Sequence, residues 1–199
     1  CTQNGVRGGN ATTHFPIWHY EIEDILVLKN NKGTEDNRVR RLDYSIQLNK
    51  LMYERLLTDG DITLFSPHDV PDLYEAFFSD QEKFKTLYEN YERKTSIRKK
   101  KISAMELFSA LIKERAETGR MYIMNVDHAN THSSFKDTVY MSNLCQEITL
   151  PTKPLQHIDD PDGEIALCIL SAINVGLIKE LDDMEELCDL AVRALDEII

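Results

Sequence analysis

The chain lacks any apolar run approaching the roughly 18–20 residues that a membrane-spanning helix needs. Its N-terminus also lacks the basic, apolar and small-residue succession of a signal peptide. Cysteine is scarce, with four in 199 residues, and none stands in a Cys-x-x-Cys pair or a zinc-finger spacing. These absences predict a cytoplasmic protein with no membrane partner, no structural metal and no disulfide framework.

Basic residues are outnumbered, with 23 Lys and Arg against 34 Asp and Glu, which gives a net charge of -11. Such a charge repels a polyanion in bulk, so the chain is not expected to bind a nucleic-acid polymer. It leaves room for a nucleotide held in a local pocket. A hydrophobic content of 42% with 29% charged residues is ordinary for a soluble globular protein.

The four cysteines are Cys1, Cys145, Cys168 and Cys188. Cys188 lies on an apolar helical seam and is predicted to be a core residue. Cys145 and Cys168 could meet in space, which the sequence leaves open. Because the chain begins at Cys1 rather than Met, we expect a segment of a longer polypeptide or a processed piece.

Strand and helix patterns alternate along the chain, which predicts an α/β architecture with mainly parallel pairing. About five strands are recognisable, too few for a closed barrel, so the pattern is typical of a slice through a larger α/β barrel. Four of these strands are expected over 42–48, 62–65, 120–126 and 164–171. The helices are expected within 15–28, over 51–57, after the capping boxes at Ser79 and Ser103, the second ending at Gly119, and over 181–198.

Two polar segments each have a functional and a plainer interpretation. The basic run over 93–101 could bind phosphate, but a solvated connector between helices is favoured. His128 and His132 would share one face of a helix and could bind a metal. Their segment follows a strand and is predicted to be a loop, so no metal site is expected.

Residues 1–10 are rich in glycine, with Gly5, Gly8 and Gly9 around Arg7. Such a segment lets backbone N–H groups and a guanidinium approach an anion closely. It could therefore contact a nucleotide, although glycine content alone favours a flexible surface loop. The Walker and dinucleotide-binding fingerprints are absent from the sequence.

The segment 142–148 combines a carboxamide, a thiol and a carboxylate at Asn143, Cys145 and Glu147. If the segment is extended, alternation directs all three side chains the same way. An amide that orients a substrate and a carboxylate that takes a proton are partners for thiol chemistry. Spacing alone nevertheless favours a buried, inert cysteine.

Six blocks of the chain, in order, resemble the catalytic large subunit of aerobic (class I) ribonucleotide reductase. The resemblance spans essentially the whole chain, which makes it more specific than Asn-Leu-Cys-x-Glu by itself. The blocks are Thr2-Gln3-Asn4-Gly5-Val6-Arg7-Gly8-Gly9, Leu26-Val27-Leu28-Lys29-Asn30-Asn31, residues 61–71, Asn125-Val126-Asp127-His128, Ser142-Asn143-Leu144-Cys145-Gln146-Glu147-Ile148 and Gly163-Glu164-Ile165-Ala166-Leu167-Cys168.

The resemblance implies a ten-stranded α/β barrel in which a central finger loop carries Cys145, and residues 1–199 are part of this catalytic barrel. By family analogy, Cys145 becomes a transient thiyl radical that removes the ribose 3′ hydrogen. Glu147 acts as general base on the 3′ hydroxyl, and Asn143 hydrogen-bonds the substrate. Cys168 matches one half of the redox-active pair, whose other cysteine is expected outside this chain.

The resemblance also assigns the glycine-rich segment to a loop that links an effector site to the substrate base. Gln3 and Arg7 are the candidates for contacts with the base and the phosphate, and Gly8 and Gly9 complete the loop. Asn4 stands where relatives often have Gly, which leaves the conformation of this loop open.

Partners and effectors are likewise implied by the resemblance. A metal-containing small (beta) subunit supplies the radical, thioredoxin or glutaredoxin supplies the reductant, and ATP and deoxynucleoside triphosphates act as effectors. No cofactor or metal is expected in this chain. The large subunit forms a homodimer, and the remaining parts of that subunit complete the barrel. By itself the chain is expected to be inactive.

Two functional hypotheses follow. In the first, the chain is an enzyme segment that reduces ribonucleoside diphosphates to 2′-deoxyribonucleoside diphosphates within a full subunit. In the second, it is a non-catalytic remnant or a split-gene fragment that binds nucleotide or a partner subunit. A thiol-dependent acyl enzyme is disfavoured because Cys145 has no convincing histidine partner in the sequence.

Overall fold

The structure is a computed structural model that describes residues 2–3 and 5–198. The chain divides into two compact units, Cys1–Pro151 and Thr152–Ile199. Helices and strands are interspersed as expected, so the predicted α/β class is confirmed.

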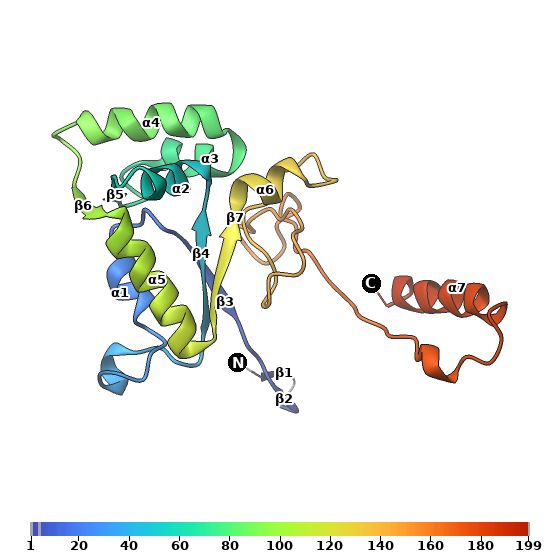
Figure 1. The fold of residues 1–199 in the computed structure, drawn as a ribbon. Coiled ribbons are helices and arrows are strands. Elements are labelled where there is room, and N and C mark those ends of the chain that lie inside the picture. The colour runs from blue at the N-terminus through green and yellow to red at the C-terminus, as the bar shows by residue number, and fades with distance from the viewer. Residues whose placement is uncertain (1, 4, 199) are drawn as a thin grey trace. The chain divides into compact units, whose positions relative to one another are not determined.

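The first unit is built on a parallel sheet whose strand order is β3-β4-β7 (Figure 1). These strands are β3 (Thr12–Pro16), β4 (Asp43–Leu48) and β7 (Met121–Asn125). The strands predicted over 42–48 and 120–126 are therefore confirmed. The start of the helix predicted within 15–28 is wrong, because β3 runs to Pro16 and α1 occupies only Ile22–Leu26. Pro16 disfavours helical geometry in the residue before it, and this signal outweighs the apolar spacing.

Helices pack on the face of the sheet that carries Tyr44, Ile46 and Leu48, all of which are buried (Figure 1). Beside this sheet, α5 (Ala104–Thr118) contacts both α1 and α2 (Lys50–Leu57). α5 begins and ends as predicted. The Ser103 side chain accepts a hydrogen bond from Glu106 N at 3.4 Å, and Gly119 adopts a left-handed conformation after the last turn.

A second, antiparallel pair joins β5 (Asp61–Phe65) to β6 (Lys99–Ser103). The strand predicted over 62–65 is thus confirmed. The connector predicted over 93–101 is wrong from Lys99 onward, where β6 begins. Strand pairing in this unit is both parallel and antiparallel. Lysine-rich sequence is compatible with an edge strand, where charged side chains reach water and discourage further pairing. The Lys99 ammonium donates to the carbonyl of Glu92 at 2.7 Å, at the end of the preceding helix.

That preceding helix, α4 (Gln81–Arg93), follows α3 (Pro71–Ser79) with one residue between them. The helix cap predicted at Ser79 is wrong, because Ser79 ends α3 and Asp80 caps α4. The Asp80 carboxylate accepts from Lys83 N at 2.9 Å. A carboxylate next to serine serves the same capping role, so the sequence signal located the boundary but not the capping residue.

Aromatic side chains from α3 and α4 enclose the indole of Trp18, which is fully buried. Its ring centroid lies 5.6 Å from that of Phe77 in an edge-to-face arrangement, and Phe77 lies 5.1 Å from Phe84. Such pairs add about 0.5–1.5 kcal/mol each beyond the burial of their area. This cluster fixes α3 and α4 against the segment that follows β3.

Residues 127–132 were predicted to be a loop, and this prediction is wrong. They belong to α6 (Val126–Thr131) and its C-terminal cap, so His128 and His132 do share a face, with ring centroids 5.7 Å apart. The Asn130 amide donates to Val126 O at 2.8 Å and Val139 O at 3.0 Å. Tertiary contacts with α3 and residue 139 thus support a helix of weak intrinsic propensity. Within the described residues, no group of three or more metal-ligating side chains is assembled.

The N-terminal ribbon pairs β1 (Thr2–Gln3) with β2 (Arg7–Gly8) in antiparallel register. Gly5 sits in the turn with φ of 71°, a conformation that costs glycine little. The predicted loop is therefore a short hairpin. A 3-10 turn, η1 (Glu35–Asn37), lies in the connection from α1 to β4.

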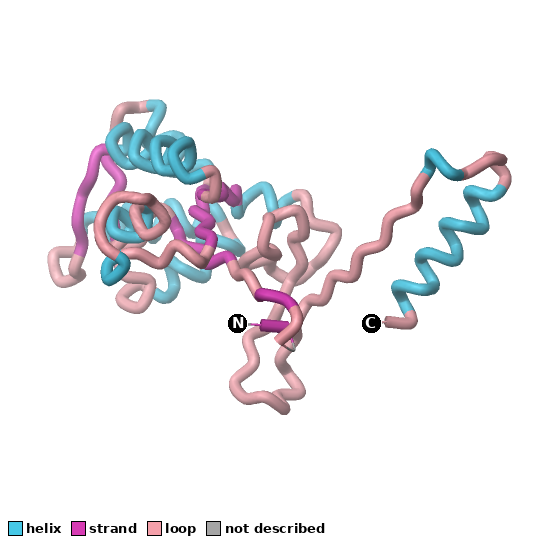
Figure 2. Tube along the Cα trace, turned by 90° about the horizontal axis from the view of Figure 1, so that it is seen from below, coloured by secondary structure: helices cyan, strands magenta, loops and turns pink. Residues whose placement is uncertain are grey.

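The second unit contains η2 (Val175–Leu177) and α7 (Asp183–Asp196), with loop over most of the remaining residues (Figure 2). The last helix is confirmed, but the strand predicted over 164–171 is wrong: those residues have no regular strand structure, and only Glu164 makes a bridge, with Lys153. Cys188 is exposed, which contradicts its prediction as a core residue. No described residue of this unit is buried, because neither strand pairs nor a second helix cover its apolar side chains.

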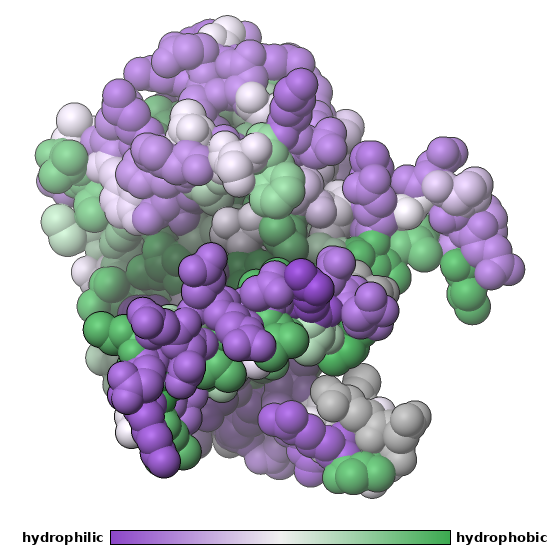
Figure 3. All heavy atoms as spheres, turned by 90° about the vertical axis from the view of Figure 1, so that its right-hand side faces the viewer, coloured by the Kyte–Doolittle hydropathy of each residue, from purple (hydrophilic) through white to green (hydrophobic). Residues whose placement is uncertain are grey.

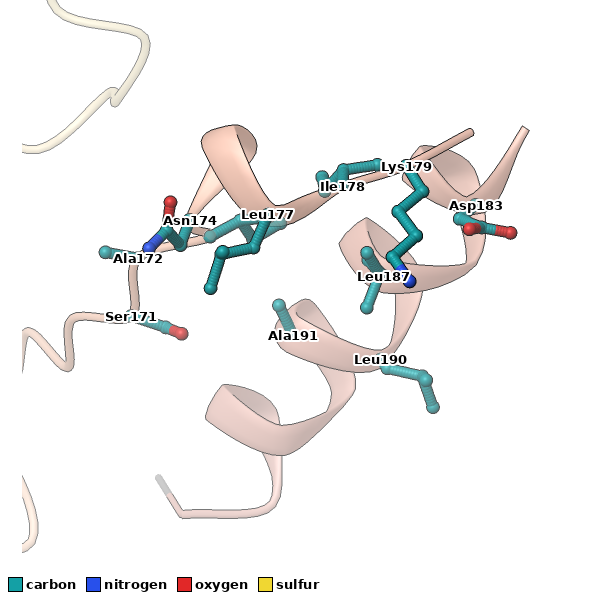
Figure 4. Close-up of a pocket in the computed structure, with 11 residues that line it drawn as sticks. Ser171, Ala172, Asn174, Leu177, Ile178, Lys179, Asp183, Leu187, Leu190 and Ala191 are labelled. Atoms are coloured by element: carbon teal, nitrogen blue, oxygen red, sulfur yellow. The ribbon is translucent and has the colours of Figure 1, made fainter. Parts of the chain in front are cut away.

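Leu177 and Ala191 point toward one another across a hollow of about 630 Å³ between η2 and α7 (Figure 4). Hydrophobic side chains are also visible between hydrophilic ones on the molecular face in Figure 3. Among the described helices, none is long and apolar enough to cross a membrane.

Candidate active site

The face of the sheet opposite the helices is polar. Residues paired across the sheet share a face, and one such row consists of His14, Ser45 and Tyr122. Ser45 and Gln47 alternate with the core residues of β4 and are buried as well. Because buried polar groups need hydrogen-bond partners, this face requires a cover that can supply them.

Residues 140–146 supply that cover through three hydrogen bonds. The Gln47 amide donates to Tyr140 O at 2.7 Å, and the Thr12 hydroxyl donates to Leu144 O at 2.7 Å. The Gln146 amide hydrogen-bonds the Ser45 hydroxyl. The segment that carries the predicted catalytic residues is therefore tied to β3 and β4 from both sides of Cys145.

The segment 142–148 forms a turn rather than an extended strand, so the alternation considered from the sequence does not apply. Asn143 N donates to Ile148 O at 3.2 Å, and Ile148 N donates to Asn143 Oδ1 at 3.1 Å. Gln146 has φ of 66°, in the left-handed region. Asparagine and glycine adopt this region more readily than glutamine, so the Gln146 conformation is held by its tertiary contacts.

The turn brings the three predicted residues into one short, partly exposed loop. Cys145 and Glu147 are exposed, and Asn143 is half-buried. The buried position of Cys145 favoured by spacing alone is therefore wrong. The side-chain oxygen of Asn143, Oδ1, accepts the hydrogen bond from Ile148 N that closes the turn. The side-chain nitrogen, Nδ2, is therefore the atom that can donate to another partner.

Tyr122 stands next to this turn and was not identified from the sequence. Burial raises the pKa of its phenol, and the Cys145 side chain and the Asp43 carboxylate raise it further, while Arg120 opposes them. Only the tertiary pairing of β7 with β4 places Tyr122 there. The available sequence signal was its position two residues into a predicted strand.

His14 lies in the same row, and burial lowers its pKa, with the Ser142 backbone opposing the shift. Both ring nitrogens are buried without a hydrogen-bond partner among the described residues. This side chain, too, was missed in the sequence, where it stood immediately before the segment 15–28 that was interpreted as a helix.

The remaining predicted residues belong to other segments of the chain. Arg7 and Gly8 are exposed in β2, and Gln3 pairs with Arg7, although its side chain lies outside the described part of the structure. Cys168 belongs to the second unit and is exposed. The turn around Cys145 therefore holds Asn143, Cys145 and Glu147, three of the predicted site residues.

Gly9 lines a pocket of about 480 Å³ at the end of the sheet where β3, β4 and β7 begin. Arg120 approaches Asp43 at 3.5 Å, and Lys29 pairs with the same carboxylate at 2.6 Å. One carboxylate thus faces several cations, so the pocket is locally positive in an acidic chain. Its lining residues are Gly9, Asn10, Lys29, Arg40, Arg41, Asp43 and Arg120.

The chain is similar to known proteins over its full length. A family model described as "Ribonucleotide reductase, barrel domain" matches residues 1–199. The chain is 63% identical, over all of its length, to ribonucleoside-diphosphate reductase subunit alpha of Buchnera aphidicola subsp. Schizaphis graminum, of which it covers 26%. It is also 63% identical to the corresponding subunit of Haemophilus influenzae, covering 27% of that protein. Over 78% of its length it is 63% identical to ribonucleoside-diphosphate reductase 1 subunit alpha of Escherichia coli K12, of which it covers 21%.

Proposed function

The chain belongs to the ribonucleotide reductase barrel-domain family, and on this premise we propose that it forms part of the catalytic barrel of a ribonucleoside-diphosphate reductase large subunit. The observation that carries the proposal is the full-length match, at 63% identity, to a protein named as the alpha subunit of that enzyme. The chain spans about a quarter of the length of the curated relatives it matches over its whole length. The activity is therefore proposed for a subunit that includes this segment.

In the proposed reaction, a ribonucleoside diphosphate loses its 2′ hydroxyl as water and becomes a 2′-deoxyribonucleoside diphosphate, a DNA precursor. Cys145, as a thiyl radical, takes the 3′ hydrogen and returns a hydrogen atom at the end. Two thiols supply the reducing electrons and form a disulfide. The exposure of Cys145 on a turn tied down at Leu144 and Gln146 supports this role, because a substrate can reach a thiol of fixed position.

Glu147 is proposed to accept the proton of the 3′ hydroxyl, a role that suits an exposed carboxylate near neutral pH. Asn143 is proposed to hydrogen-bond the ribose through Nδ2. The bond from Ile148 N to Asn143 Oδ1 supports this assignment, because it fixes the orientation of the amide and occupies its oxygen, whereas Nδ2 is the donor.

Cys168 is proposed as one of the two reducing thiols. Its exposure is compatible with access by a substrate and by an external dithiol. The second thiol, the radical input from a metal-containing small subunit, and thioredoxin or glutaredoxin as reductant complete the proposal. The homodimer of large subunits and the regulation by ATP and deoxynucleoside triphosphates belong to it as well.

The hairpin with Gln3, Arg7, Gly8 and Gly9 is proposed to contact a nucleotide. The locally positive pocket beside Gly9 supports this assignment, since phosphate groups favour sites with several cations and accessible backbone N–H groups.

The test is a chimeric large subunit in which residues 1–199 replace the matching segment of the Haemophilus influenzae subunit. Its activity is measured as deoxynucleoside diphosphate formed in the presence of the small subunit, ATP and thioredoxin. We expect activity in the chimera, loss to background in Cys145→Ala, and a loss of about 10²- to 10⁴-fold in Glu147→Gln. Cys188→Ala, at another exposed cysteine, is the matched control and should retain activity.

Survival of deoxynucleotide formation in Cys145→Ala would contradict the radical-thiol assignment. A folded chimera that binds nucleotide but forms no product, with or without Cys145, would favour the non-catalytic remnant.

A further inference from the structure

Gln146 adopts a left-handed backbone conformation in the turn that carries Cys145, with φ of 66°. Its backbone N donates to Asn143 O at 3.3 Å, so this conformation is part of how the turn closes. A residue with a Cβ is unfavourable in the left-handed region, where glycine or asparagine is the usual choice. A glutamine at this position therefore needs a contact that offsets the cost.

The Gln146 side chain makes such a contact with β4. Its Nε2 donates to the hydroxyl of Ser45, which lies 101 residues earlier in the chain. Ser45 is fully buried, and a buried hydroxyl needs a hydrogen-bond partner. The bond thus satisfies the polar face of the sheet and holds Gln146 at the same time.

Ser45 is a firm point of attachment because β4 is the central strand of the sheet (Figure 1). In the strand register, Ser45 pairs with His14 of β3 on one side and with Tyr122 of β7 on the other. Hydrogen bonds to two neighbouring strands restrict the backbone at this position. A side chain bound to Ser45 is therefore bound to one of the least mobile parts of the unit.

The second attachment of the turn is of a different kind. The Thr12 hydroxyl donates to the backbone carbonyl of Leu144 at 2.7 Å, and any residue at position 144 offers that carbonyl. The bond to Ser45 depends on the side chain of Gln146. Substitution of Gln146 consequently releases the turn after Cys145 and leaves the attachment before it in place.

We propose that Gln146 is a positioning residue for the turn: by binding Ser45, it holds the left-handed conformation and so fixes where its neighbours Cys145 and Glu147 lie. The attachment itself depends only on β4 and the turn. Its consequence for catalysis rests on the function proposed above, in which Cys145 and Glu147 act on one substrate.

The attachment is tested by hydrogen exchange of the intact chain, followed by mass spectrometry of a peptide that covers residues 143–148. Gln146→Ala removes the side-chain amide but keeps a Cβ, and with it the unfavourable backbone conformation. We expect exchange in this peptide to accelerate by about 2- to 10-fold, the range for loss of one ordinary hydrogen bond. Exchange in a peptide covering β4 should not change.

A double-substitution cycle shows whether Gln146 acts through Ser45. Ser45→Ala should accelerate exchange in the 143–148 peptide by a similar factor. The combined variant should exchange no faster than either single variant, because both substitutions remove the same bond. A combined effect equal to the product of the two single effects would overturn the proposal.

Gln81→Ala is the matched control. It removes a glutamine amide from the same unit, where Nε2 donates to Phe77 O at 2.8 Å. We expect it to leave exchange in the 143–148 peptide unchanged. An unchanged rate in Gln146→Ala, or an equal acceleration in Gln81→Ala, also overturns the proposal.

The catalytic consequence is measured in the chimeric subunit. Because the Gln146 amide binds Ser45 rather than substrate, Gln146→Ala should lower kcat by about 10- to 100-fold and leave KM for the nucleoside diphosphate unchanged. Gln81→Ala should retain both values. A raised KM with unchanged kcat in Gln146→Ala would overturn a positioning role. If the chimera with Gln146 intact is inactive, the proposed function fails, whereas hydrogen exchange still decides the attachment.

Discussion

At the scale of single residues, His14 shows that a polar side chain on the covered face of the sheet can destabilise the folded state. Its ring nitrogens are buried without partners among the described residues, and burial lowers its pKa from 6.5. The folded state therefore favours neutral His14, and the contribution of His14 to folding stability is greatest above pH 6.5. As the pH falls below 6.5, the unfolded chain takes up the proton first, so this contribution is progressively lost.

We predict that His14→Phe stabilises the chain by about 1–3 kcal/mol at pH 7.5, because it removes two buried, unpartnered nitrogens. The advantage over the unchanged chain should be larger at pH 5.5, where protonation of His14 destabilises the folded state. Urea unfolding at the two pH values measures both effects. His68→Phe, at a histidine side chain that is 95% exposed, is the control. An equal pH-dependent gain in both variants would contradict the assignment to His14.

The same scale separates residues that the sequence identified from those it missed. Asn143, Cys145 and Glu147 were found because they lie within five residues of one another. Thr12, Ser45 and Tyr122 come from three different strands, and only strand register collects them on one face. A chemical motif that is local in sequence is visible there, whereas the surroundings that orient it are not.

At the scale of secondary-structure elements, local signals predicted helix ends where one residue type is required by the backbone. Gly119 ends α5 with φ of 64°, and an added Cβ would meet no atom within 4 Å. The requirement for glycine is therefore conformational rather than steric.

We predict that Gly119→Ala destabilises the chain by about 1–2 kcal/mol, the cost of a left-handed conformation for an ordinary residue. Gly119→Asn should cost less, because asparagine tolerates this conformation. Thermal unfolding of the two variants compares them directly. Equal losses in both would mean that something other than backbone conformation determines the residue at this position.

The strand predictions failed where pairing with a distant strand, rather than local composition, determines whether a segment becomes a strand. Lys99–Lys101 form a strand because Thr63, Leu64 and Phe65 present partners for their backbone groups. The apolar residues 164–171 form none, because no described strand pairs with them. An apolar run is a strand only when a neighbour supplies hydrogen bonds.

At the scale of the whole molecule, burial is distributed unevenly between the two units. In the first unit, Trp18, Ile46 and Phe77 are fully buried, whereas no described residue after Pro151 is buried. Hydrophobic burial is the main stabilising contribution to folding, so the second unit has little tertiary stabilisation of its own in the described chain. A single helix of 14 residues is marginal in water.

We predict that backbone amides of α7 exchange with solvent deuterium much faster than those of β4 in the isolated chain. Hydrogen exchange followed by mass spectrometry, with peptides covering α7 and β4, measures the difference. In the chimeric subunit, α7 should become protected if the rest of the large subunit covers its apolar side chains. Protection of α7 equal to that of β4 in the isolated chain would contradict this prediction.

The sequence by itself determined the α/β class, the boundaries of α2, α5 and β4 to within a residue or two, and the family. It did so because hydrophobic periodicity, capping residues and ordered motifs are local properties of the chain. Tertiary structure decided which strands pair, that residues 142–148 form an anchored turn, and that Tyr122 stands beside Cys145. These features depend on contacts between residues far apart in sequence, and no local pattern encodes the register that brings them together.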